Sequence, residues 1–552
     1  MKIGESIKKF GLFSLPTISE QPISGILNIS ESGETRLEIM GIYGGDSHLL
    51  NCQNKIKRIN GILEDGEMVT LDNCFWGKTV HKFHGLSKGE IIVNTALIGH
   101  HYEDNDAVEF YEVAFHIEGL FDWLSASGIK IESNWKDRSD NIQFTPLDNI
   151  EHSLGNGIKL RFAFGWNKSN SWKEIHITQT AYIFIISDVP MPLNHFVDII
   201  FKLNNFFCLI LDDTINIQKV TGYSKEITED IGNGQIVETA INIYYPTINY
   251  SDNITRSSMG NFLLRYSDVE SRIGDILKLW LENYSISEPA FNLYFSAKSG
   301  GSKYLDGQFL LLAQGLETLH RRNSQETLFP KVEFKTLLND IIKHCPDNRR
   351  EWLRGRISFG NELPLRKRIE KMIEPFKELY GSELERDGLI KKIVATRNYF
   401  THYDPKAEQK SAKGKELWDL CMKLESIFQL NFLKIVGIDS AQIMMVAENH
   451  YNLRKKLTLP GGKLMDLIEP QQQSPEDAIF MEIQSALSHL LVQFQQKDKL
   501  SQQGTAENIA LSQPLIDEIE SMDTSVSIDL LIKSLLSLGA TREEIAAAVA
   551  GK

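Results

Sequence analysis

Residues 389–402 of the chain read LIKKIVATRNYFTH. The first half of this stretch repeats apolar residues at helical spacing, which predicts a helix. Pro405 follows closely, and the residue before a proline is biased away from helical backbone, so we expect the helix to end near His402. Arg397 lies five residues before His402 and is followed directly by Asn398. The stretch therefore places a permanent cation, an amide and a titratable imidazole near the end of one helix.

An Arg and a His without a neighbouring carboxylate or cysteine cluster fit RNA cleavage that needs no metal. A His side chain can donate or accept a proton near neutral pH. An Arg side chain can bind a phosphate through two hydrogen bonds and stabilise charge in a transition state. A purely structural interpretation also fits, in which Arg397 is a surface cation and His402 is a positive group favoured at a helix C-terminus. The spacing alone leaves both interpretations open.

The pattern Arg-polar-x3-His at the end of a long helix resembles HEPN domains, and the local string RNYFTHYD, residues 397–404, resembles their ApeA-type branch. Residues 309–322, FLLLAQGLETLHRR, are similar to the early helix of that branch, an apolar rod that carries a Glu and a His. Residues 25–39 and 61–71, which both open on Gly-Ile-Leu, are similar to the start of the ApeA N-terminal domain. The resemblance extends over roughly residues 10–450.

This resemblance implies a metal-independent HEPN endoribonuclease of bacterial anti-phage defence, acting by abortive infection on cellular RNA, with tRNA as one candidate. Arg397 and His402 would be catalytic, with Asn398 and Glu317 in support and no metal or other cofactor. The expected partners are RNA, an unidentified phage-derived trigger and further copies of the chain in a homodimer or larger assembly. Glu317 could instead pair only with Arg321, one helical turn further on. The alternative function is a non-catalytic HEPN scaffold that dimerises or binds a partner, which the Arg/His pair disfavours.

Net charge and missing motifs exclude several classes of function. The 552 residues carry a formal charge of −14, which argues against a protein that coats nucleic acid with its whole surface. Residues 331–415 nevertheless hold 20 Lys and Arg against 13 Asp and Glu, a net of +7. This basic stretch is either a solvated helix surface or a local RNA-binding face. No Walker A or GxGxxG motif occurs, and no His or Cys spacing requires a metal site.

The cysteines and apolar runs predict a cytoplasmic location without membrane contact. The five cysteines are scattered and form no CxxC motif, which is typical of a reducing compartment. The N-terminus lacks the apolar core of a signal peptide, and the apolar run 181–186 is too short to cross a bilayer.

We expect an α+β multidomain chain. Residues 1–255 are predicted to form a β-rich, sandwich-like domain with a sensing role, in which Asp65-Gly66 makes a hairpin turn. A helix is predicted at 193–211, and the tryptophans of this part are expected in its core: Trp76, Trp123, Trp166 and Trp172. Strands are predicted near 26–29, 35–39, 62–63, 68–71, 91–98, 109–118, 158–165 and 172–186.

The remaining chain is predicted to be helical. Residues 256–455 should form an all-α HEPN bundle, and residues 456–552 a short, acidic helical tail of unknown role. Within the tail, Ser474 and Thr541 are expected to start helices, Thr541 through a capping box with Glu544. The bundle helices are predicted near 258–284, 303–322, 331–344, 364–380, 384–402 and 411–436.

Overall fold

The structure is a computed structural model. It describes residues 6–16, 22–40, 55–80, 88–134, 139–230, 232, 234–247, 262–299 and 304–458, and scattered residues between 487 and 549. Two compact units are distinguished, residues 1–463 and residues 464–552.

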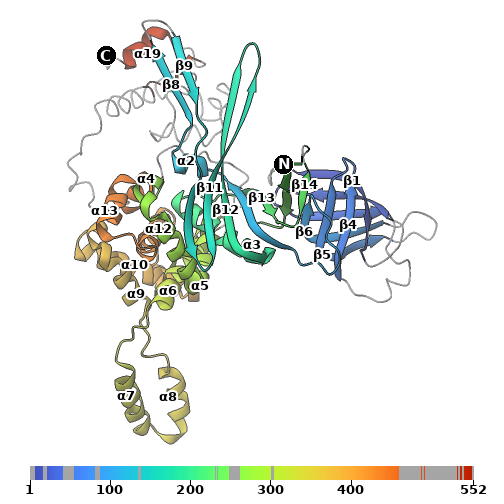
Figure 1. Cartoon of the computed structure of the whole chain (residues 1–552). Coiled ribbons are helices and arrows are strands. Elements are labelled where there is room, and N and C mark those ends of the chain that lie inside the picture. Colours follow the sequence, from blue (N-terminus) through green and yellow to red (C-terminus); the bar gives the residue numbers. More distant parts are fainter. Residues whose placement is uncertain are drawn as a thin grey trace. The chain divides into compact units, whose positions relative to one another are not determined.

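The first half of the chain is built from antiparallel strands (Figure 1). Twelve of them form one sheet in the order β10-β11-β12-β7-β13-β16-β6-β3-β2-β1-β4-β5, and the pairs β8–β9 and β14–β15 lie outside it. The strands are β1 (Ile7–Ser14), β2 (Ile23–Ile29), β3 (Thr35–Met40), β4 (Lys55–Leu63), β5 (Met68–Val80), β6 (Lys88–Ile98), β7 (Glu109–Ile117), β8 (Ile129–Asn134), β9 (Ser139–Phe144), β10 (Ile150–Gly155), β11 (Ile158–Asn170), β12 (Ile175–Pro192), β13 (Ile217–Tyr223), β14 (Thr228–Asp230), β15 (Ile236–Glu238) and β16 (Ile241–Tyr244).

The N-terminal end of this sheet closes on itself. Strand β5 also pairs with β6, in a register that runs from Val69 opposite Ile98 to Val80 opposite Lys88. The strands β6, β3, β2, β1, β4 and β5 therefore form a ring, which continues through β16 into the open half of the sheet. The predicted α+β class is confirmed, but the strands form one continuous sheet and not two sheets packed as a sandwich. Both arrangements bury every second residue, so the alternating sequence pattern could not separate them.

A phenylalanine fills the ring where three glycines face it. Phe13 is fully buried on β1, directly opposite Gly61 of β4. A Cβ atom at Gly61 would collide with the Phe13 ring, and a Cβ at Gly11 or Gly25 would lie 3.1 Å from it. The two Gly-Ile-Leu segments of the sequence thus share a physical cause, because each places its glycine against the same ring.

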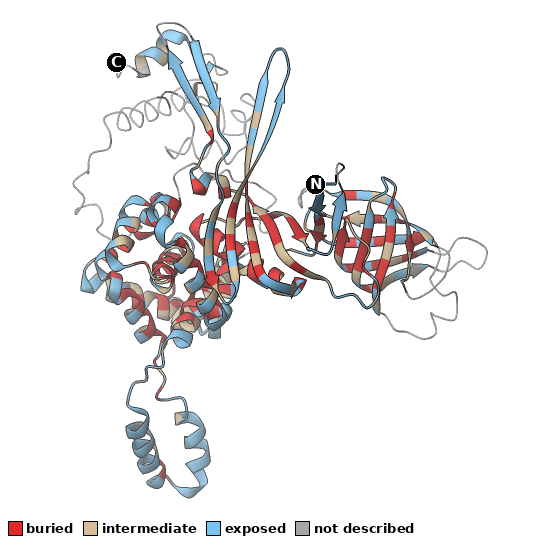
Figure 2. Cartoon of the chain, viewed as in Figure 1, coloured by how far each residue is buried: buried red, intermediate tan, exposed pale blue. Residues whose placement is uncertain are grey.

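The helix predicted at 193–211 is confirmed as α3 (Leu193–Ile210), which packs on β7 and β12 in the open half of the sheet. By length and composition α3 could cross a membrane, but 67% of it is buried inside the chain, as in the core helix of a globular domain. Trp123 is also fully buried here, and its indole N–H donates to the Leu264 carbonyl at 2.8 Å. Trp166 and Trp172 contradict the prediction of a core position, since they are 51% and 96% exposed. They lie toward the turn of the long β11–β12 hairpin, which Figure 2 shows as exposed.

The second half of the chain is helical. Helix α5 runs through Pro289 to Lys298, beyond the predicted end at 284, because buried aromatic residues after the proline outweigh its missing N–H. The helices are α2 (Leu120–Leu124), α4 (Tyr266–Val269), α5 (Ile273–Lys298), α6 (Leu305–Asn323), α7 (Lys331–Lys343), α8 (Arg350–Ile357), α9 (Leu365–Ile373), α10 (Glu383–His402), α11 (Pro405–Glu408), α12 (Lys415–Ile435), α13 (Ser440–Asn449), α14 (Tyr451–Thr458) and α19 (Arg542–Val549), with 3-10 turns η1 (Glu270–Arg272), η2 (Asp347–Arg349) and η3 (Glu374–Tyr380).

A buried set of four charges joins the end of α3 to the helical bundle. Asp212, just after α3, accepts from Lys456 of α14 at 2.9 Å and from Lys298 of α5 at 3.1 Å. Glu425 of α12 pairs with the same two lysines, at 3.0 and 3.3 Å. Burial alone would raise the pKa of Asp212, but the opposite effect of the two lysines is larger and holds this pKa well below its usual value. Two carboxylates and two ammonium groups thus meet at one point, and their formal charges balance.

The tail is described only in part. Thr541 and Glu544 form the predicted capping box at the start of α19: the Glu544 N–H donates to Thr541 Oγ1 at 3.2 Å, and the Thr541 N–H donates to Glu544 Oε2 at 2.8 Å. The helix start predicted at Ser474 lies outside the described residues.

Candidate active site

Helix α10 has a defined start and a defined end. Ser382 and Glu385 form a capping box at its N-terminus. The last helical residue is His402, after which Tyr403 adopts a left-handed backbone with φ 49°. Asp404 then accepts from the N–H of Lys406 at 3.0 Å and starts α11. The predicted end of the helix at His402 is confirmed.

The buried face of α10 fixes which side chains it exposes. Ile390, Ile393 and Thr396 point into the bundle. The Thr396 hydroxyl also accepts from the N–H of Ala412 at 2.9 Å, which ties the helix to the loop before α12. Arg397, one residue beyond Thr396, is at the edge of this face and its side chain is 35% exposed. Asn398 and His402 are exposed.

Glu317 of α6 lies between two arginines. Its Oε2 is 3.4 Å from Arg397 Nη2, and its Oε1 is 3.1 Å from Arg321 Nη2. Arg397 Nη1 is also 3.5 Å from the side-chain oxygen of Asn398. Both contacts considered for Glu317 are therefore present at once, since one carboxylate pairs with the arginine of its own helix and with Arg397.

His402 belongs to a different side of the helix. Five residues of an α-helix turn by about 500°, so His402 and Arg397 point about 140° apart. The helix stays regular to its last residue and does not bring them together. Within the described part of the chain, the His402 side chain makes no hydrogen bond or ion pair. The rings of Tyr399 and Tyr403, close to His402 in the sequence, pack edge to face with their centroids 5.6 Å apart. The structure thus groups Arg397, Asn398 and Glu317 and leaves His402 free to meet another molecule.

Two further pairs extend the polar network and were not predicted from the sequence. Arg321 also binds Glu362, at 3.1 Å. Arg368 is only 3% exposed and donates from Nη1 to His320 Nδ1 at 3.3 Å, because a guanidinium has no acceptor. Burial lowers the pKa of His320, and the Arg368 cation lowers it further, which keeps this imidazole neutral. The resemblance of residues 309–322 to the early HEPN helix includes His320, but no local sequence pattern indicates that Glu362 belongs to this network.

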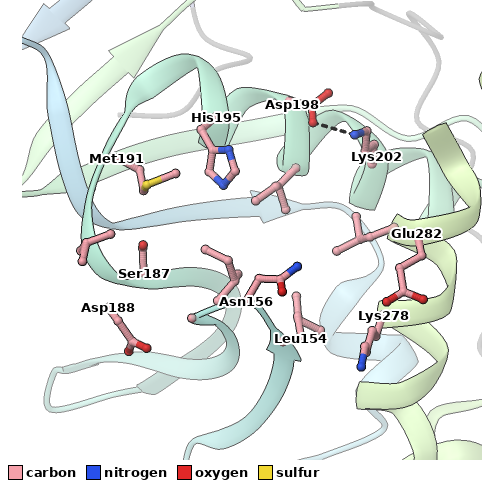
Figure 3. A pocket seen from close by; sticks show the side chains of 16 residues that line it. Leu154, Asn156, Ser187, Asp188, Met191, His195, Asp198, Lys202, Lys278 and Glu282 are labelled. Carbon is pink, nitrogen blue, oxygen red and sulfur yellow. Dashed lines mark hydrogen bonds and ion pairs between the residues drawn. The ribbon is translucent and has the colours of Figure 1, made fainter.

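A large pocket of about 670 Å³ lies elsewhere in the same unit, between β10–β12, α3 and α5 (Figure 3). Figure 3 shows His195 on one side and Lys278 and Glu282 of α5 on another, with Asp198 and Lys202 paired at 2.7 Å. Charges of both signs line this mainly apolar pocket, which does not suit a polyanion such as RNA. Within the part of the chain that the structure describes, no three His, Cys, Asp or Glu side chains gather as metal ligands would.

Comparison with protein families gives two matches. Residues 8–280 match ApeA N-terminal domain 1, and residues 310–442 match the Apea-like HEPN domain. No curated protein and no solved structure matches the chain.

With both domains matched in this order, the chain belongs to the ApeA-type HEPN proteins, a group of anti-phage HEPN-family proteins. HEPN domains are commonly RNases. The matched residues 310–442 include Arg397 and His402, the two residues that the sequence predicts as catalytic.

The geometry around Arg397 predicts the effect of neutralising Glu317. In Glu317→Gln the ion pair with Arg397 becomes a hydrogen bond from a cation to a neutral amide, which is weaker by about 1 kcal/mol. We expect RNA cleavage to fall about fivefold, since about 1.4 kcal/mol corresponds to a factor of ten in rate, while the unfolding temperature stays nearly unchanged. The control is Glu326→Gln, which removes the carboxylate of another surface ion pair. Glu326 Oε2 lies 2.6 Å from Lys371 Nζ, and this pair does not include Arg397. Equal activity of the two variants would show that Glu317 does not position Arg397.

Proposed function

We propose that this protein is a metal-independent endoribonuclease of anti-phage defence that cuts cellular RNA, with tRNA as a candidate substrate. The observation that supports the proposal is the end of α10. There an arginine is oriented by a carboxylate and an imidazole is exposed to solvent on the last helical residue. A scaffold that only binds partners would have no need for this combination.

The chemistry follows from the two side chains. His402 takes the proton from the ribose 2′-OH, and the 2′-oxygen attacks the adjacent phosphorus. Arg397 holds the phosphoryl oxygens and stabilises the charge that they gain in the transition state. The bond to the 5′-oxygen breaks, and that oxygen takes up a proton from an imidazolium or from water. The products are a 2′,3′-cyclic phosphate and a 5′-hydroxyl, so atoms and charge balance without a cofactor.

Replacing His402 tests this proposal. Loss of a positioned proton-transfer group typically costs about 10²–10⁴-fold in rate, so His402→Ala should cleave total cellular RNA that much more slowly. His176→Ala is the control, because His176 is also exposed but lies on β12. Wild-type cleavage should survive EDTA. Full activity of His402→Ala, or loss of wild-type activity in EDTA, would contradict the mechanism.

We also propose that the active form is a homodimer or larger assembly. One regular helix points Arg397 and His402 about 140° apart, so a single copy presents them poorly to one phosphate. A two-fold axis, the commonest oligomer symmetry, would bring two such helices to one cleft. In that arrangement, the Arg397 of one copy and the His402 of the other can act on the same phosphate.

Complementation tests the shared site. Inactive Arg397→Ala and inactive His402→Ala are mixed and allowed to exchange subunits. Half of the resulting dimers pair unlike copies, and each of these keeps one of two sites, so about a quarter of wild-type activity should return. Light scattering on the same sample should show a dimer or larger species. A fully active monomer, or no recovery despite subunit exchange, would contradict the dimer.

The β-rich N-terminal domain is proposed as the sensing part, because Arg397 and His402 both lie in the helical part. Its ligand would be a phage-derived trigger, and the protein would act in the cytoplasm.

A further inference from the structure

A helical hairpin projects between α6 and α9. Helices α7 and α8 pack against each other, and Ile342 is the one residue of either helix that is fully buried. Figures 1 and 2 show the pair as a separate, almost wholly exposed arm. Its thirteen-residue helix α7 is about 20 Å long. We call residues 327–362 the arm.

One face of the arm combines an exposed tryptophan with two free arginines. Trp352 is 62% exposed. Arg356 lies about 40° from it around α8, and Arg349 is the N-cap residue one turn before it, whereas Arg354 lies about 160° from Arg356. In the described part of the chain, none of these three arginines has a carboxylate within 4.0 Å. Arg350 differs, because it pairs with Asp347 at 2.7 Å and donates to the Cys345 carbonyl at 3.0 Å.

The base of the arm is fixed to the candidate active site. Asn361 clamps the two ends of the arm: its Oδ1 accepts from the Phe329 N–H at 2.8 Å, and its Nδ2 donates to the Phe329 carbonyl at 3.0 Å. The next residue, Glu362, binds Arg321, which shares Glu317 with Arg397. An unbroken chain of ion pairs therefore runs from the base of the arm to Arg397.

We infer that the arm binds single-stranded RNA, with Trp352 stacking on a base and Arg349 and Arg356 contacting phosphates. This inference rests on the proposed function and names the surface that holds its substrate. Exposed aromatic and arginine side chains on one face are the usual means of binding single strands, since every base can stack and every phosphate is negative. In an acidic protein, unpaired arginines suit a polyanion.

A second copy of the chain is a less suitable occupant for this face. Leu337 and Ile341 of α7 are exposed and could pack against protein. A two-fold contact through the Trp352 face, however, would bring Arg349 and Arg356 close to their own symmetry mates. Like charges brought together in this way oppose association.

The test measures binding separately from cleavage. Full-length His402→Ala protein is titrated onto a fluorescent single-stranded RNA and onto tRNA, with anisotropy as the readout. In this background, Trp352→Ala should weaken binding by roughly fivefold to a hundredfold, the range for loss of one stacked base. Trp352→Phe should retain most of the affinity.

Arg356→Ala and Arg354→Ala form a matched pair, since both remove an exposed arginine from the last turn of α8. Arg356→Ala should weaken binding and lower the slope of log affinity against log salt by about 0.7, as expected for one lost phosphate contact. Arg354→Ala should change neither. Circular dichroism and light scattering confirm that fold and mass are kept.

Equal effects of Arg354→Ala and Arg356→Ala, or unchanged binding by Trp352→Ala, would overturn the inference. A fall in molecular mass on replacing Trp352 would identify the arm as a self-association surface and overturn it as well. If RNA binding depends on the arm but wild-type protein cleaves no RNA, the proposed function fails alone. If cleavage depends on His402 while binding ignores the arm, this inference fails alone.

Discussion

The buried set of Asp212, Lys298, Glu425 and Lys456 is the constraint on which the first unit of the chain depends. Its members come from the end of α3, from α5, from α12 and from α14. Breaking a buried ion pair by removing one partner typically costs about 3–5 kcal/mol, because the other charge stays buried and unpaired. Loss of any one member would therefore leave an unbalanced charge between the end of α3 and the helical bundle.

A second shared carboxylate has the corresponding role nearer the surface. Glu317 contacts both Arg321 and Arg397, so the base of the arm and the end of α10 depend on the same side chain. These ion pairs are partly exposed, and each contributes less to the free energy of unfolding than a buried ion pair would. Under the proposed mechanism, these pairs would orient the Arg397 side chain before a phosphate binds.

Local rules account well for the parts of the fold that were predicted. Pro405 ended α10 where expected, and the Thr541–Glu544 box started α19. Helix α8 was missed, since eight Arg-rich residues hold too short an apolar repeat to stand out. The predicted end of α5, at residue 284, came too early. Buried aromatic packing beyond Pro289 outweighs the local cost of the proline, and this packing is not visible in the local sequence.

Contacts between segments that are far apart in the sequence could not be predicted from local sequence patterns. Asp212 and Lys456 are 244 residues apart, and nothing in either neighbourhood indicates the other. The closed ring likewise depends on the β5–β6 pairing, which the strand pattern leaves open. In the candidate site, Arg397, His402 and Asn398 could be found from one short stretch. The partnership of Arg397 with Glu317 could be proposed as one of two options, and only the fold shows that Glu317 serves both arginines.

The chemical ends left on cleaved RNA show most directly whether an arginine and a histidine cut RNA through its own 2′-hydroxyl. The measurement uses an oligonucleotide cut at one mapped position and a matched oligonucleotide with a 2′-O-methyl group at that position. We expect a 2′,3′-cyclic phosphate and a 5′-hydroxyl from the first oligonucleotide, and no cut at the blocked position in the second. A 5′-phosphate with a 3′-hydroxyl, or cleavage at the blocked position, would contradict it.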